Sequence, residues 1–134
     1  MATIKNYTDI EQSKKLAEIL PIESADMYYQ YVLPKSDKIK HIPEIGNPEE
    51  ALEWYNKGYT HFGKEPLSLK EYCIPCWGLA ALMDVLDRGA LFKTPKGWVC
   101  QTYIEYEAIT SDYYRNPIDA CVAMIEKLHE QKLL

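Results

Sequence analysis

The chain contains one Cys-x-x-Cys pair, Cys73-Ile74-Pro75-Cys76, and these residue types could do chemistry directly. Two thiols at this spacing can bind one zinc ion, exchange disulfides with another molecule, or fill a hydrophobic core. The elements that position the pair decide between a functional and a structural role.

A thiol-redox site is the first functional interpretation of Cys73 and Cys76. Thioredoxin-like proteins have a proline before the second cysteine and a helix after it, and the helix N-terminus lowers the thiol pKa. This chain has both features. The segment 64–72 before the pair, however, does not resemble the strand of a βαβ unit that such a site requires.

A zinc site would need two ligands besides Cys73 and Cys76. The candidates are His61, Cys100 and Cys121. No second Cys-x-x-Cys or His-x-x-x-His pair occurs, and Cys100 and Cys121 fall on apolar faces that we expect to point inward. The simplest prediction is structural: Cys76 lies in the core, and Cys73 lies near the surface or half-buried.

No complete catalytic set is visible in the sequence. The chain has no Gly-x-Ser-x-Gly, no phosphate-binding glycine loop and no His-Glu-x-x-His. His41 and His129 are interpreted as a loop residue and a helix-end cation, and nothing local pairs His61 with either thiol as base and nucleophile. We therefore assign no catalytic residue, and the sequence favours a protein that is not an enzyme.

Tyrosine is in excess, with 11 residues in the chain. Tyrosine rings give rigid contact area at low entropy cost and are enriched at protein–protein interfaces. A single tyrosine is more simply a core-rim or sheet residue, but a clustered set predicts a face that binds a protein partner. The candidate partner-binding residues are Tyr28, Tyr29, Tyr31, Tyr113 and Tyr114.

Composition narrows the class of protein. The 134 residues are 47% hydrophobic and 26% charged, with a formal net charge of -5. An acidic chain gains nothing from phosphate neutralisation, so we expect no nucleic-acid partner. The N-terminus lacks the apolar core of a signal peptide, and no apolar run approaches the ~20 residues of a membrane helix. We expect a cytoplasmic protein without a membrane partner, whose cysteines stay reduced.

Capping signals predict three helices. Thr8-Asp9-Ile10-Glu11 has capping-box spacing, and Asn116-Pro117 opens a C-terminal helix with a regular apolar stripe. Asn47-Pro48 opens another helix, which we expect to end at Gly58. Its apolar residues are expected to point inward: Ala51, Leu52, Trp54 and Tyr55.

A central helix is expected to begin at Pro75 and to end near Gly89. Ser68-Leu69-Lys70-Glu71 is another capping box, but Pro75 would kink a helix that ran through from there. A start at Pro75 would place the cysteine pair at a helix N-terminus.

Strand signals follow that helix. Segments 91–94 and 98–106 flank the turn residues Pro95-Lys96-Gly97, and further strands are expected near 108–112 and 27–32. The predicted fold class is α+β, with one antiparallel sheet of three to four strands packed against about four helices. All of 1–134 is expected to form a single domain.

Three segments also resemble a known family: Ser24-Ala25-Asp26-Met27-Tyr28-Tyr29, the run from Ile74 to Leu82, and Asn116-Pro117-Ile118-Asp119-Ala120-Cys121. From about Leu16 to Leu134, the chain is similar to small uncharacterised Bacteroidetes proteins, often encoded on prophages or conjugative elements. The resemblance implies a mobile genetic element context and brings no activity, cofactor or catalytic residue. In the proteins it resembles, alanine often stands at the position of Cys76, which weighs against metal and redox roles.

The sequence thus predicts a small cytosolic accessory protein that acts by protein–protein binding. The alternative is a thiol-redox or zinc-binding protein that uses Cys73 and Cys76, with zinc as its cofactor. The protein partner is unidentified, and a homo-oligomer is an open alternative.

Overall fold

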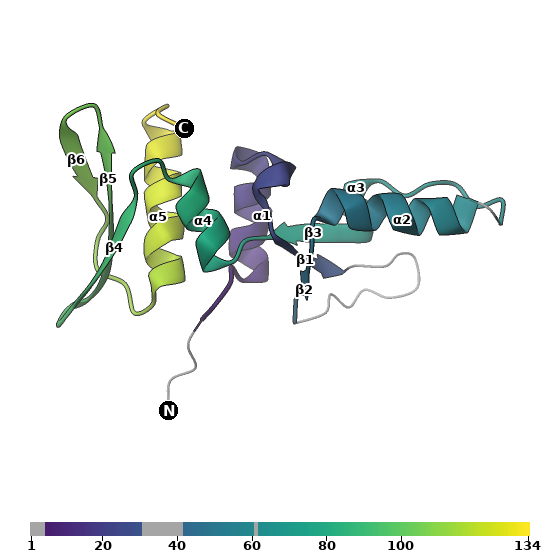
Figure 1. Cartoon of the computed structure of the whole chain (residues 1–134), viewed down its shortest axis with the longest axis horizontal. Coiled ribbons are helices and arrows are strands. Elements are labelled where there is room, and N and C mark those ends of the chain that lie inside the picture. The colour runs from purple at the N-terminus through teal and green to yellow at the C-terminus, as the bar shows by residue number, and fades with distance from the viewer. Residues whose placement is uncertain (1–4, 31–41, 61) are drawn as a thin grey trace. The chain divides into compact units, whose positions relative to one another are not determined.

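The computed structural model describes residues 5–30, 42–60 and 62–134. The chain falls into two compact units, shown in Figure 1. Unit 1 joins the N-terminal residues up to Thr8 with Gly78–Leu134, and unit 2 is Asp9–Trp77. Both units combine helices with antiparallel strands, which confirms the predicted α+β class. The single domain over 1–134 stays a prediction.

Unit 2 contains a three-stranded antiparallel sheet with strand order β2-β1-β3. Its elements in chain order are α1 (Ile10–Ile19), the 3-10 helix η1 (Ile22–Ser24), β1 (Met27–Gln30), β2 (Glu44–Ile45), α2 (Pro48–Thr60), α3 (Leu69–Tyr72) and β3 (Cys73–Cys76). The strand predicted near 27–32 is confirmed as β1. The remainder of that prediction, together with the loop that carries His41, lies outside the described residues.

The predicted helix start at Pro75 is wrong, because Cys73–Cys76 forms strand β3. This strand pairs with all of β1, from Met27 opposite Cys76 to Gln30 opposite Cys73. Pro75 is tolerated because β3 is an edge strand, where a missing N–H need not break a ladder hydrogen bond. The capping box at Ser68 starts the short helix α3 instead, and this helix ends at Tyr72.

Two further helix boundaries in unit 2 differ from the prediction. The N-cap of α1 is Asp9 rather than Thr8: its carboxylate accepts from the Gln12 N–H at 2.8 Å, and the Gln12 side chain accepts from the Asp9 N–H at 3.1 Å. Helix α2 begins at Pro48 as predicted but continues past Gly58 to Thr60. The sequence therefore located these helices correctly and missed their ends by one or two residues.

Unit 1 contains a second three-stranded antiparallel sheet, with order β4-β5-β6. Its elements are α4 (Leu79–Val85), β4 (Ala90–Thr94), β5 (Gly97–Ile104), β6 (Glu107–Thr110) and α5 (Pro117–Glu130). The meander predicted after Gly89 is confirmed, but the described residues form two sheets where one was predicted. Helix α4 begins at Leu79 and is capped at its end by Leu86, not Gly89.

Helix α5 forms the core of unit 1. It begins at the Asn116 cap as predicted, with Oδ1 accepting from the Asp119 N–H at 2.8 Å, and it packs against β5 and α4. The apolar stripe expected from the sequence is buried: Ile118, Cys121, Val122, Ile125 and Leu128.

Glycine is required at the first residue of β5, directly after the turn from β4. Gly97 has φ +131°, and a Cβ atom there would come within 2.6 Å of the Tyr114 carbonyl oxygen. The same carbonyl accepts from the Trp98 N–H, which ties the segment before α5 to the start of β5. Within the described residues, none of the helices combines the length and apolar character needed to cross a membrane.

Candidate functional site

Strand β3 separates the two thiols of the Cys-x-x-Cys pair. Residues i and i+3 of a strand point to opposite faces and lie ~10 Å apart along the chain. A disulfide needs Cα atoms closer than ~7 Å, and one zinc ion needs thiolates on the same side. All four cysteines are free. In this strand, Cys73 and Cys76 cannot be joined to each other or to one metal ion unless β3 leaves its pairing with β1.

The prediction that Cys73 lies near the surface or half-buried is wrong. Its side chain is 1% exposed, and it belongs to a buried cluster with Tyr28 and Tyr72. Burial raises the pKa of the Cys73 thiol to about 12, whereas a reactive cysteine has a lowered pKa. Cys76 is 0% exposed, which confirms its predicted place in the core. The environment of β3 therefore favours the structural role of the pair.

The other candidate zinc ligands, His61, Cys100 and Cys121, are not described as part of one site with β3. His61 lies outside the described residues, and Cys100 and Cys121 belong to unit 1. The Cys121 thiol lies 3.6 Å from the Met83 sulfur. The interaction of Cys121 with Cys100 raises the pKa of Cys121 and lowers the pKa of Cys100. In the part of the chain that the structure describes, no three or more His, Cys, Asp or Glu residues form a group that could hold a metal.

Two members of the predicted tyrosine set are buried in unit 2. Tyr28 and Tyr29 are 8% and 2% exposed, so their rings face the interior of unit 2. The Tyr28 hydroxyl donates to the Glu44 carboxylate at 2.9 Å, and burial together with this carboxylate raises the pKa of Tyr28. These two rings contribute to the core rather than to a free surface.

The remaining members of the set are Tyr31, Tyr113 and Tyr114, and the last two belong to unit 1. Tyr31 lies outside the described residues. Tyr113 is 52% exposed, with the Lys96 ammonium 5.7 Å from its ring centroid, and Tyr114 is half-buried and pairs through its backbone with Trp98. Tyr113 is thus the described member with the most exposed ring, and partner binding by Tyr113 or Tyr114 stays a prediction.

Four tyrosines instead form a continuous ladder that fixes α2. The ring centroids are 6.3 Å apart for Tyr28 and Tyr72, 4.7 Å for Tyr72 and Tyr55, and 4.4 Å for Tyr55 and Tyr59. The last two pairs are stacked. Offset or tilted aromatic pairs each add stabilisation beyond the area that they bury. The ladder connects β1 through α3 to the inner side of α2.

Asn56 provides a second connection between α2 and the chain that follows it. Its Oδ1 accepts from the Leu67 N–H at 2.8 Å, and its Nδ2 donates to the Leu67 carbonyl at 3.0 Å. Both polar ends of the amide are therefore used. Together with the tyrosine ladder, this clamp holds the helix in one orientation on unit 2.

Large aromatic rings are exposed on α2 and in the turn after it, and we call this set the α2 aromatic face: Trp54, Tyr59 and Phe62. They are 75%, 43% and 81% exposed. The Lys57 ammonium lies 5.6 Å from the centroid of Trp54, and the Lys64 ammonium lies 5.4 Å from that of Tyr59. Large rings with this exposure on one helix and the turn after it are typical of protein-binding surfaces.

The prediction that Trp54 points inward is wrong. The side of α2 that packs on the buried cluster carries Ala51, Leu52 and Tyr55, and Trp54 lies about 100° from Tyr55 around the helix axis. The sequence contained this signal, because a helical wheel places Trp54 beside the stripe rather than on it. The prediction placed Trp54 inward because tryptophan is apolar, and it gave too little weight to the position of Trp54 on the helical wheel.

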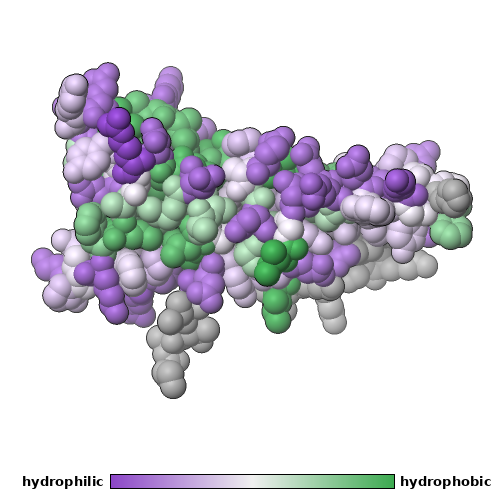
Figure 2. Space-filling view, viewed as in Figure 1, coloured by the Kyte–Doolittle hydropathy of each residue, from purple (hydrophilic) through white to green (hydrophobic). Residues whose placement is uncertain are grey.

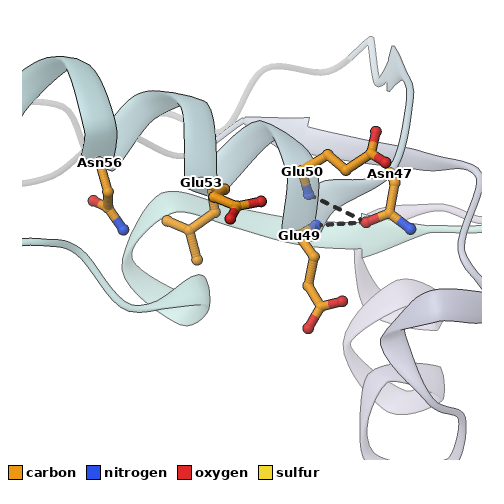
Figure 3. A pocket seen from close by; sticks show the side chains of 6 residues that line it. Asn47, Glu49, Glu50, Glu53 and Asn56 are labelled. Atoms are coloured by element: carbon orange, nitrogen blue, oxygen red, sulfur yellow. Dashed lines mark hydrogen bonds between the residues drawn. The ribbon is translucent and has the colours of Figure 1, made fainter.

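An open hollow of about 530 Å³ lies along the first three turns of α2. Its lining residues are Asn47, Glu49, Glu50, Leu52, Glu53 and Asn56. Figure 3 shows these side chains spaced along the helix, with the Asn47 oxygen accepting from the N–H groups of Glu49 at 2.8 Å and Glu50 at 3.3 Å. Asn47 and Asn56 thus serve the fold.

Apart from the Asn47 and Asn56 side chains, the polar groups that line the hollow are three carboxylates. Within the described residues, the side chains of Glu49, Glu50 and Glu53 make no hydrogen bond or ion pair. Figure 2 shows hydrophilic and pale side chains along the part of the surface that contains α2. The hollow and the α2 aromatic face therefore offer hydrogen-bond acceptors and aromatic rings on one helix.

Comparisons with family models, curated proteins and solved structures find no significant match to this chain. The resemblance to Bacteroidetes proteins of mobile elements accordingly stays a prediction. The function is inferred from the surface of α2 itself.

Proposed function

We propose that this protein is a non-catalytic binding module that docks another protein on the α2 aromatic face. The observation that carries the proposal is the 75% exposure of Trp54 on a regular helix. Tryptophan is the residue type most enriched at binding hot spots, and a large apolar ring in water gains free energy when a partner covers it.

The rigidity of α2 supports the proposal. The tyrosine ladder and the Asn56 clamp hold the helix from its inner side, so the exposed rings are presented by a fixed backbone. A surface that is ordered before binding loses less conformational entropy on association. This arrangement suits recognition better than it suits a catalytic lid, which has to move.

The proposal also covers the cellular compartment of the protein and its genetic context. We infer a cytoplasmic accessory protein of a mobile genetic element, on the basis of the family resemblance and of four cysteines that are all free, as is usual in a reducing compartment. Its partner is a protein rather than nucleic acid or a membrane, since the net charge is -5.

The thiol-redox or zinc alternative requires β3 to separate from β1. Elemental analysis of the purified protein tests it: we expect the same zinc content, near zero, in the natural chain and in Cys76→Ala. One zinc per chain that disappears in Cys76→Ala would replace the binding-module proposal with the alternative.

Selection of peptides from a random display library tests the proposal directly. The full chain is immobilised, and the peptides that bind are re-measured against Trp54→Ala and Tyr106→Ala. Tyr106 is the matched control, because it is 99% exposed in the turn between β5 and β6 of unit 1. We expect Trp54→Ala to weaken binding at least about tenfold, as for a hot-spot residue, and Tyr106→Ala to change it less than about twofold. Equal binding to both variants, or no enriched peptide, would refute docking on α2.

A further inference from the structure

The charges around Trp54 are mainly negative. Glu50 lies one helical turn before it, Glu53 directly before it, and Lys57 one turn after it. Glu49 adds a third carboxylate in the same first turns of the helix. A partner that covers the α2 aromatic face therefore brings its own side chains close to these groups.

We infer that the partner segment that docks on the α2 aromatic face is basic, with arginine or lysine side chains placed against Trp54 and the neighbouring glutamates. The inference rests on the proposed function and adds the chemical class of the partner. Charge complementarity at an interface determines which partner is accepted and how fast it associates.

The ring of Trp54 is the first reason. The Lys57 ammonium lies 5.6 Å from its centroid and makes a cation–π contact with it, while most of the Trp54 residue stays exposed. Tryptophan is the best aromatic partner for cations, and a guanidinium group can stack on the ring while its N–H groups point outward. An arginine of the partner would extend this arrangement.

The carboxylates are the second reason, and they are independent of the ring. A segment that covers Glu50 and Glu53 without donors would remove water from two charges and leave them unpaired, which is costly. An acidic or phosphorylated segment would add repulsion between like charges. Guanidinium and ammonium groups instead form charge-assisted hydrogen bonds with carboxylates. The Trp54 ring and the glutamates of the hollow therefore both favour a positively charged partner side chain.

The library selection used for the proposed function also tests this inference. We expect arginine and lysine to be over-represented among the peptides whose binding depends on Trp54. The tightest of these is then synthesised with a fluorescent label, together with a copy in which every arginine is replaced by citrulline, which keeps the shape and removes the charge. We expect the citrulline copy to bind about tenfold more weakly.

A double variant measures the contribution of the glutamates. Glu50→Gln/Glu53→Gln should weaken binding of the labelled peptide about three- to tenfold at low salt and flatten its salt dependence. The matched control is Glu107→Gln/Glu130→Gln, which removes two exposed carboxylates from unit 1 and should change binding less than about twofold. All four side chains are at the surface, so circular dichroism should show the same fold for each variant.

The possible results separate the two levels of the hypothesis. Neutral or acidic peptides that still depend on Trp54, or full binding to Glu50→Gln/Glu53→Gln, would overturn the basic partner and leave the binding module intact. Peptides that bind independently of Trp54 would refute the binding module. A dimer in analytical ultracentrifugation that Trp54→Ala converts to a monomer would mean that a second copy covers the face, and would also overturn the basic partner.

Discussion

Strand β3 and helix α2, both in unit 2, differ in how their residue types relate to their surroundings. Strand β3 carries two thiols at a spacing used by zinc and redox sites, but both side chains are buried and the strand turns them to opposite faces. Helix α2 carries no catalytic motif, yet it exposes a tryptophan beside a hollow lined by carboxylates. The comparison shows that burial and backbone direction, and not residue type alone, decide which segment can meet another molecule.

The same comparison explains why tyrosine count was a poor guide to the binding surface. Tyr28, Tyr55 and Tyr72 are used inside unit 2, where they connect β1, α3 and α2. The exposed rings of α2 depend on this ladder, since it fixes the helix that carries them. The tyrosines near β1 thus support the candidate site without forming it.

The largest expected effect concerns thiol reactivity in β3. Because burial raises the pKa of Cys73 to about 12, its reaction with Ellman's reagent at pH 8 should be at least about a thousandfold slower in the native chain than in 6 M guanidinium. Mass spectrometry after alkylation identifies the modified residue. Rapid labelling of Cys73 in the native chain would show that β3 opens. The contrast between a buried β3 and an exposed α2 would then not hold.

The next effect compares two tryptophans with opposite burial. Trp77 directly follows β3, is 0% exposed, and donates from Nε1 to the Ser24 hydroxyl at 2.9 Å. Trp77→Ala should lower the free energy of unfolding by about 3–5 kcal/mol, whereas Trp54→Ala should change it by less than about 0.5 kcal/mol. Urea denaturation measures both. A loss above about 1.5 kcal/mol in Trp54→Ala would mean that the ring of Trp54 is packed rather than exposed.

A smaller effect is expected at the clamp that orients α2. Asn56→Ala removes both hydrogen bonds to Leu67 and should cost about 1–3 kcal/mol. Lys57→Ala, at the next and exposed position, is the control and should cost less than about 0.5 kcal/mol. If both variants have the same stability as the natural chain, the clamp does not hold the helix, and the rigid presentation of Trp54 loses its support.

The smallest effect is a dependence of stability on alkaline pH that belongs to β3. The folded chain keeps the Cys73 proton up to a pKa of about 12, while the unfolded chain releases it near the ordinary thiol value of 9.0. Between these values the unfolded chain binds fewer protons, so stability falls as pH rises. The raised pKa values of Tyr28 and Tyr72 act in the same direction.

Chemical denaturation from pH 7 to 10.5 measures this dependence. The slope in Cys73→Ala should be shallower than in the natural chain by at most one proton, with little change below pH 8. Identical slopes in the two proteins would mean that the thiol ionises equally in both states, and that β3 is not buried as described.

Local signals in the sequence predicted much of the fold. The Asn116-Pro117 start and apolar stripe of α5, the Asn47-Pro48 start of α2 and the turn at Pro95-Lys96-Gly97 were all read correctly. Each depends on residues within a few positions of one another, because caps, turns and helical stripes are formed by near neighbours. The α+β class follows from these elements.

The tertiary structure alone decided what happens at the cysteine pair and on α2. Cys73–Cys76 becomes a strand because β1, more than 40 residues earlier, supplies its hydrogen-bond partners, and no local propensity contains that pairing. Trp54 is exposed because the tyrosine ladder and Asn56 fix which side of α2 faces inward. Strand pairing and burial depend on contacts between distant segments, and these contacts determine which of this protein's side chains a partner can reach.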